Sequence, residues 1–142
     1  MEDCFGRVEF MINNIILTGQ PHSGKSTLLQ RLLPDIPLRR GFITQEILCE
    51  GVRTGFEVWT DDNIEFVLAH VDYRHLPERV SRYGVDVKGF EVMLPALFEY
   101  QPDQLLYFDE IGQMELFSER FKTLARNYLD APNLFIGTLS AV

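Results

Sequence analysis

Eight consecutive residues near the N-terminus have the types and spacing that phosphate binding needs. Residues 19–26 read Gly-Gln-Pro-His-Ser-Gly-Lys-Ser and match the pattern G-x-x-x-x-G-K-[ST]. The glycines let the backbone turn so that several N–H groups point at one place. Lys25 can then reach the β- and γ-phosphates of a nucleotide, and the Ser26 hydroxyl is suited to bind Mg²⁺. The predicted phosphate-binding residues are Gly19, Gln20, Pro21, His22, Ser23, Gly24, Lys25, Ser26 and Thr27.

The segments on either side of this loop support the same prediction. Residues 11–18 form an apolar run that predicts a buried strand leading into the loop. Four leucines within residues 28–33 share one helical face, and Pro34 is expected to end the helix. A phosphate bound by the loop would also face the positive N-terminus of this helix. Strand, loop and helix therefore follow one another in the order that the motif requires.

A second apolar run ends in two carboxylates. Residues 104–109 predict a strand whose last residue is Asp109, and Glu110 follows it directly. Ligands of α/β sheets bind at the carboxyl ends of the strands, so Asp109 is expected to hold Mg²⁺ opposite Ser26. Glu110 is suited to orient and deprotonate an attacking water. The two acidic residues therefore favour hydrolysis of a nucleoside triphosphate.

Two other functions remain open at this stage. A small-molecule or nucleotide kinase would transfer the phosphate to an acceptor other than water, and Glu110 argues against it. A nucleotide-binding switch without turnover would need only the loop. Phosphate release without an acceptor separates hydrolysis from both.

Positive charge near the transferred phosphate would lower the barrier to its transfer. Arg40 and Arg53 are predicted as catalytic residues with Lys25 and Glu110, and both arginines rank ahead of Arg82. His22 occupies a variable position of the loop, and its side chain is expected to face outward.

The middle of the chain predicts an antiparallel insertion. Residues 40–49, 52–60 and 64–69 read as three strands separated by turns, and together they predict a meander. Residues 71–89 are polar with few periodic cues and predict a long loop.

The last part of the chain alternates helix and strand. Residues 90–98 have helical spacing, and the helix is expected to begin or kink near Pro95. Ser118 can cap a helix that ends before Pro132, and residues 134–138 predict a final buried strand. The pattern predicts an α/β fold with a mainly parallel sheet and an antiparallel β insertion.

Length and composition suit one small domain. The chain has 142 residues, of which 46% are hydrophobic, so residues 1–142 are expected to form a single domain with its own core. No apolar run is long enough to span a membrane, and the acidic N-terminus lacks the start of a signal peptide. A cytoplasmic protein without a membrane partner is expected.

The net charge and the two cysteines indicate which partners and which state of the thiols to expect. The net charge of −8 disfavours nucleic acid as a partner, because such binding requires basic residues to neutralise phosphates. It permits nucleotide binding, since a local lysine and backbone amides can act against the overall field. Cys4 and Cys49 have no metal-binding spacing and are expected to be free thiols. The oligomeric state is not indicated.

Four blocks of residues resemble the THEP-type nucleoside-triphosphatases, a P-loop family with a RecA-like core. The resemblance implies a three-layer P-loop NTPase sandwich and hydrolysis of the γ-phosphate of ATP, GTP and other nucleoside triphosphates with Mg²⁺. The blocks are residues 19–29, residues 41–46 with 53–56, residues 83–87 with 90–91, and residues 109–118 with 137–138.

The chain departs from this family at two places. Gln113 stands where the family usually has lysine. The family usually continues beyond the strand that ends in Gly-Thr, here residues 137–138, so the domain is expected to be shorter than its relatives at the C-terminus. The open edge of a strand would then affect stability and base recognition.

Overall fold

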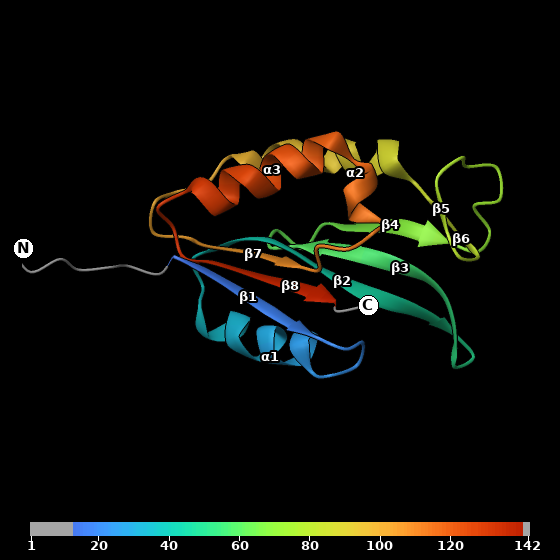
Figure 1. The fold of residues 1–142 in the computed structure, drawn as a ribbon, viewed down its shortest axis with the longest axis horizontal. Coiled ribbons are helices and arrows are strands. Elements are labelled where there is room, and N and C mark those ends of the chain that lie inside the picture. Colours follow the sequence, from blue (N-terminus) through green and yellow to red (C-terminus); the bar gives the residue numbers. More distant parts are fainter. Residues whose placement is uncertain (1–12, 141–142) are drawn as a thin grey trace, which may run out of the picture.

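One sheet of eight strands runs through residues 13–140, the part of the chain that the computed structural model describes (Figure 1). The strands are β1 (Asn14–Gly19), β2 (Arg39–Cys49), β3 (Val52–Thr60), β4 (Glu65–His70), β5 (Arg79–Val80), β6 (Tyr83–Val85), β7 (Leu105–Asp109) and β8 (Phe135–Ser140). Their order across the sheet is β1-β8-β7-β2-β3-β4-β6-β5.

The sheet is mixed, and the prediction of a mainly parallel sheet is wrong. β1, β8, β7 and β2 pair in parallel, whereas β2, β3, β4, β6 and β5 pair in antiparallel. The insertion is larger than predicted because two short strands extend the meander. They were not predicted because strands of two and three residues are too short to show an alternation of apolar and polar residues.

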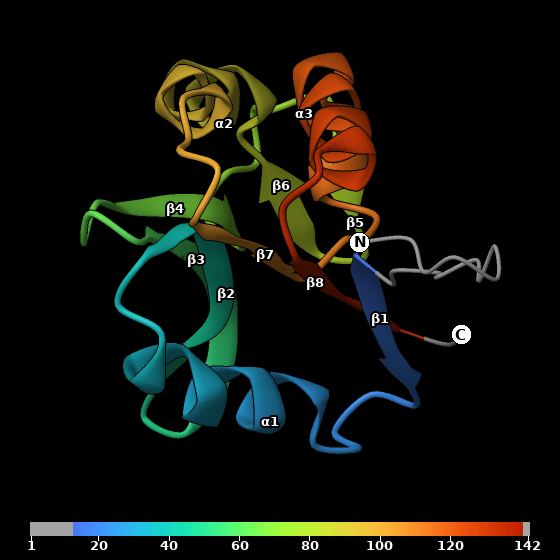
Figure 2. The same ribbon diagram turned by 90° about the vertical axis from the view of Figure 1, so that its left-hand side faces the viewer.

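Helices cover both faces of the sheet (Figure 2). They are α1 (Lys25–Leu32), α2 (Val87–Met93) and α3 (Glu119–Asp130), with short 3-10 helices η1 (Leu33–Asp35), η2 (Leu94–Phe98) and η3 (Glu115–Phe117). α1 lies on one face, and α2 and α3 lie on the other. None of the helices among the described residues is long and apolar enough to cross a membrane.

β7 has apolar residues on both faces because each face meets a core. Leu106 and Phe108 join the larger core beneath α2 and α3, where the Phe108 ring stacks on Tyr128 at 4.6 Å between centroids. Leu105 and Tyr107 join the smaller core beneath α1. Successive side chains of a strand point to opposite faces, so a strand covered on both sides reads as a continuous apolar run. This packing holds the end of β7, and thus Asp109, in a fixed place.

Several predicted elements are confirmed within one or two residues. These are the three strands of the meander, the strands that became β7 and β8, and the helix that follows Ser118. The Ser118 hydroxyl accepts a hydrogen bond from the Phe121 backbone N–H at 3.0 Å, as expected for a helix cap. Cys49 is an exposed free thiol, whereas Cys4 and residues 11–12 lie outside the described residues.

Two local predictions are wrong. β1 lies at the edge of the sheet that the described residues form, and Ile15 and Ile16 are exposed, whereas its apolar run predicted burial. Residues 71–89 are not a single loop, because β5 and β6 form within them and α2 already begins at Val87. The Asp86 carboxylate caps α2 by accepting a bond from the Gly89 N–H at 2.9 Å. Pro95 marks the expected break, since the α-helix gives way there to η2.

The β2–β3 hairpin projects beyond the end of β7. β2 pairs with β7 only as far as Ile43, which lies opposite Asp109, and then continues to Cys49. Residues 44–49 therefore form a wall with β3 next to the carboxyl end of β7. The phosphate-binding loop lies at the same edge of the sheet, at the end of β1.

Candidate functional site

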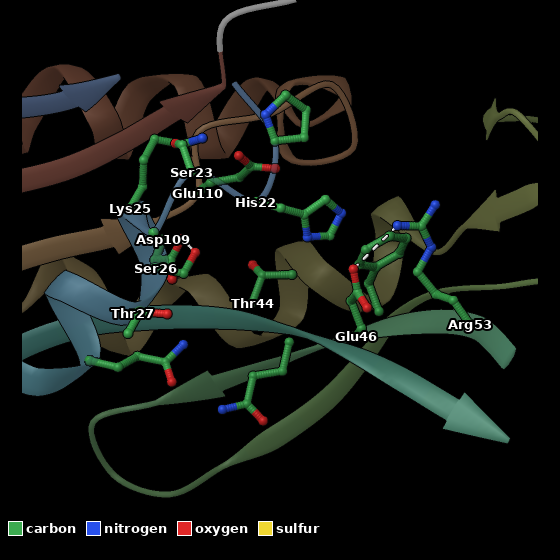
Figure 3. Close-up of a pocket in the computed structure, with 15 residues that line it drawn as sticks. His22, Ser23, Lys25, Ser26, Thr27, Thr44, Glu46, Arg53, Asp109 and Glu110 are labelled. Carbon is green, nitrogen blue, oxygen red and sulfur yellow. Dashed lines mark hydrogen bonds and ion pairs between the residues drawn. The ribbon is translucent and has the colours of Figure 1, made fainter. Parts of the chain in front are cut away.

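A pocket of about 640 Å³ lies between the loop of residues 19–24 and the β2–β3 hairpin. Figure 3 shows Lys25, Ser26, Asp109 and Glu110 at one end, with Glu46 and Arg53 at the other end. The lining residues are Pro21, His22, Ser23, Gly24, Lys25, Ser26, Thr27, Gln30, Thr44, Gln45, Glu46, Arg53, Phe56, Asp109 and Glu110. The structure therefore brings most of the predicted site together.

The loop presents backbone donors to this pocket. Gly24 has φ of 98°, a left-handed conformation that glycine adopts without a steric penalty. No side chain caps α1, so the N–H groups of its first turn are left for a ligand. Aligned N–H groups at a helix N-terminus attract anions. The loop is thus arranged to bind phosphate.

Lys25 is held over the loop by the loop itself. Its Nζ donates hydrogen bonds to the carbonyl oxygens of Gly19 and Gln20, each at 3.0 Å. An ammonium group has three donors, so these two bonds leave one for a phosphate oxygen. The charge is therefore positioned before a ligand arrives.

Asp109 has one oxygen in hydrogen bonds and one without a partner. Its Oδ1 accepts bonds from the Ser26 hydroxyl at 2.9 Å and from the Thr138 hydroxyl at 2.7 Å. Its Oδ2 is buried and has no hydrogen-bond partner among the described residues. Burial raises the pKa of Asp109, and the Ser26 and Thr138 bonds oppose that shift. A cation next to Oδ2 would satisfy the buried oxygen, so the donor set fits Mg²⁺.

Thr138 was missed as a site residue. It stands on β8, beside β7, with its hydroxyl buried against Asp109. The chain carried only a weak signal for it, because a single threonine in an apolar strand is common. Its role depends on β7 and β8 being neighbours, which only the sheet order reveals.

Arg53 reaches the pocket from β3. Its Nε donates to the Tyr83 hydroxyl at 2.9 Å, and its Nη1 contacts Glu46 Oε1 at 3.2 Å. Its guanidinium carbon lies 5.1 Å from the centroid of the Phe56 ring. These contacts fix the guanidinium at the hairpin end of the pocket.

The structure does not bring Arg40 or Arg82 to the pocket. Arg40 lies near the start of β2, where it pairs with Asp61 at 3.2 Å and donates to the Ala96 carbonyl at 2.8 Å. In the pairing of β2 with β7, Arg40 lies opposite Leu106, whereas Asp109 lies opposite Ile43, three residues further along β2. Arg82 donates to the Arg53 carbonyl and the Tyr83 hydroxyl. Of the three arginines, we therefore keep only Arg53 as a candidate.

His22 differs from expectation, and Gln113 lies away from the pocket. His22 lines the pocket instead of facing outward, and its backbone adopts a positive φ of 64°. Gln113, which stands where lysine is usual in the family, is exposed and lies outside the set of lining residues.

Glu115 was also missed, although it is fully enclosed behind the pocket. Its side chain is 3% exposed, and it accepts bonds from the Gly112 N–H at 3.2 Å and the Thr44 hydroxyl at 3.4 Å. Burial, with a smaller effect of the Glu110 charge, raises the pKa of Glu115 to about 8. It lies in the block of residues 109–118 that resembles the family, but no role was predicted for it because a glutamate near a turn is usually exposed.

Comparison with known proteins identifies the family. A family model described as NTPase matches residues 14–142. Nucleoside-triphosphatase THEP1 of Thermotoga sp. (strain RQ2) is 35% identical over 127 residues, covering 88% of this chain and 72% of that protein. The cancer-related nucleoside-triphosphatase homolog of Mus musculus is 35% identical over 145 residues, covering 91% and 76%.

A solved structure agrees with these sequences. The crystal structure of THEP1 from Aquifex aeolicus superposes with a TM-score of 0.79 at 30% identity, covering 91% of this chain and 77% of that one. The superposition covers most of the chain, so this protein shares the fold of that structure. The chain belongs to the nucleoside-triphosphatase family that includes THEP1.

Proposed function

We propose that this protein hydrolyses the γ-phosphate of nucleoside triphosphates such as ATP and GTP, giving a nucleoside diphosphate and phosphate. The observation that carries the proposal is the meeting of Lys25, Ser26, Asp109 and Glu110 in one pocket beside an uncapped helix N-terminus. The names of the relatives, nucleoside-triphosphatase in each case, support the same reaction. Broad base use follows if recognition rests on the phosphates, which every nucleoside triphosphate shares.

Ser26 and Asp109 would hold Mg²⁺ at the phosphates. Bound between these two residues and the nucleotide, Mg²⁺ would supply positive charge that offsets the negative charge of the phosphates. Residues 13–140 contain no group of three or more His, Cys, Asp or Glu side chains that could hold a metal by themselves. Two protein ligands suit Mg²⁺, which usually takes its remaining ligands from water and from substrate phosphates.

Glu110 acts on the water that attacks. Its carboxylate accepts a proton as the water oxygen bonds to the γ-phosphorus and the bond to the β–γ bridging oxygen breaks. The electron pair of that bond stays with the diphosphate. Lys25 and the loop N–H groups bind the charge on the β- and γ-phosphate oxygens. Arg53 supplies a second positive charge from the hairpin end of the pocket.

The cytoplasm is the compartment that we propose for this reaction. The exposed free thiol of Cys49 suits a reducing environment, in which such a group persists without pairing. The net charge of −8 favours a free nucleotide over a nucleic acid as the partner.

Removal of Mg²⁺ is expected to abolish phosphate release. Asp109 Oδ2 is buried without a partner among the described residues, so no protein cation stands in for the metal there. The measurement is phosphate release from ATP before and after EDTA, followed by an excess of MgCl₂. Release should stop with EDTA and return with Mg²⁺. Full activity in EDTA would contradict the metal-binding role of Ser26 and Asp109.

Replacement of Arg53 by alanine is expected to lower kcat more than it changes KM. Arginines on the transferred phosphate contribute about 10³–10⁵ in kcat, but Arg53 shares its charge with Glu46, so we expect a loss nearer ~10–10². Steady-state hydrolysis of ATP by Arg53→Ala, Arg53→Lys and the exposed control Arg126→Ala measures this. An unchanged kcat in Arg53→Ala, with normal folding, would remove Arg53 from the mechanism.

A further inference from the structure

The buried carboxyl of Glu115 joins two walls of the pocket. One oxygen accepts a bond from the Gly112 N–H, in the turn that follows Glu110, and the other accepts one from the hydroxyl of Thr44 on β2. Thr44 itself lines the pocket. The Leu116 N–H donates to the Gly112 carbonyl at 3.0 Å, which closes the same turn. Glu115 therefore links the turn after β7 to the hairpin wall.

Glu110 and Glu115 flank the same glycine. A Cβ atom added to Gly112 would lie 3.0 Å from Glu115 Oε2 and 3.3 Å from Glu110 Oε1. The two carboxyls thus approach the turn closely, and a side chain at position 112 would press on both. A shift of the Glu115 carboxyl would consequently move the segment that carries Glu110.

We propose that Glu115 is a positioning residue for Glu110, holding the turn at Gly112 against Thr44 so that the Glu110 carboxylate faces the attacking water. This inference rests on the proposed hydrolysis, in which Glu110 receives the proton. Glu115 itself is buried and is not one of the described residues that line the pocket. Its contribution is to fix the geometry of a catalytic group, which is worth a large factor because small misplacements are costly.

The protonation state of Glu115 determines whether it can hold the turn at Gly112 in place. Burial raises its pKa to about 8, so the carboxyl is neutral at lower pH and places no second negative charge beside Glu110. Glu110 is the charged side chain whose field acts on it. Of the acidic residues on the neighbouring helices, Glu91 accepts bonds from Ser118 and Arg120, and Glu119 is exposed. Ionisation of Glu115 would therefore repel Glu110 and loosen the turn.

The test compares kcat and KM for ATP hydrolysis on both sides of pH 8 in three variants. Glu115→Gln keeps the shape and stays neutral, so it should retain kcat at neutral pH and lack the fall in kcat that we expect of the wild type above pH 8. Glu115→Ala should lose about 10–10² in kcat at all pH values with little change in KM. Glu119→Gln, an exposed carboxylate on α3, should match the wild type in both respects.

The free energy of unfolding depends on the same protonation of Glu115 and gives an independent test of it. The pKa of Glu115 is 4.5 in its ordinary state and about 8 in the folded protein, so the unfolded chain loses this proton first. The free energy of unfolding should therefore decrease as pH rises between these values, and Glu115→Gln should remove that decrease. Denaturant unfolding at pH values within this interval measures the difference.

Different results would overturn the role of Glu115 or the proposed hydrolysis. A fall in kcat above pH 8 that persists in Glu115→Gln, or a normal kcat in Glu115→Ala, would overturn the inference. If Glu115→Ala does not fold, Thr44→Val removes the hydroxyl donor instead and should also lower kcat, and an unchanged kcat there would count against the link. No phosphate release by the wild type would reject the proposed hydrolysis itself, whereas release without the expected variant behaviour rejects only the role of Glu115.

Discussion

Replacement of Glu110 by glutamine is expected to stop hydrolysis and to leave nucleotide binding intact. Glutamine has nearly the same shape but cannot accept the proton of the attacking water. General-base catalysis contributes about 10²–10⁴, so kcat should fall by roughly that factor. Affinity should be preserved because the loop, Lys25 and Ser26 are unchanged. Phosphate release and titration with a fluorescent ATP analogue measure the two quantities separately.

The control for this variant is Glu65→Gln. Glu65 is an exposed carboxylate at the start of β4, outside the pocket, so its replacement should change neither kcat nor affinity. Turnover by Glu110→Gln at the wild-type rate would show that another group activates the water. Loss of affinity together with activity would instead mean that the substitution disturbed the loop.

Replacement of Lys25 by alanine is expected to weaken triphosphate binding strongly. Lys25 Nζ is held over the loop by two carbonyl oxygens, so its charge is already in place for a phosphate. A hydrogen bond to a charged group contributes about 1.5–3 kcal/mol, so loss of the one that Nζ has left for a phosphate oxygen should weaken binding by about 10- to 100-fold. Calorimetric titration with ATP in the presence of Mg²⁺ measures the change.

Lys88→Ala provides the matched control for this experiment. Lys88 is an exposed lysine on α2, so its removal changes the net charge equally without touching the pocket. Binding by Lys25→Ala at wild-type affinity would contradict the assignment of the loop as the phosphate site. A weakened affinity in both variants would indicate that overall charge matters more than the local contact.

The phosphate-binding half of the site was predictable because its signals are local. The loop needs glycines and a lysine at fixed spacing, and its helix follows at once, so neighbouring residues specify the geometry. Asp109 was predictable because β7 is apolar on both faces and ends abruptly in a carboxylate. Both signals depend on residues within one short segment of the chain.

The other half of the site could not be predicted as well from the sequence. Thr138, Thr44 and Glu115 reach the site only because β8 and β2 flank β7 and because η3 folds back beneath the turn. Arg40 and Arg53 looked alike as isolated charges, yet one pairs with Asp61 away from the pocket and the other lines it. Contacts between distant segments decided these roles.

The wrong predictions about the fold also arose because contacts between segments cannot be seen in the sequence. The apolar run of β1 predicted burial, whereas burial depends on what lies beside a strand, and β1 has a single neighbour, β8, among the described strands. α2 was placed too late because Gly89 lies in its first turn, where glycine weakens the helical signal. The Asp86 cap was the stronger cue for where this helix begins.

In the proposed reaction, water is the acceptor of the γ-phosphate in this pocket. The most direct measurement is hydrolysis of ATP with Mg²⁺ in water enriched in oxygen-18, without any other acceptor, followed by mass spectrometry of both products. Attack of water on the γ-phosphorus should place the heavy oxygen in the released phosphate and not in the diphosphate. Heavy oxygen in the diphosphate, or no phosphate release despite tight nucleotide binding, would contradict it.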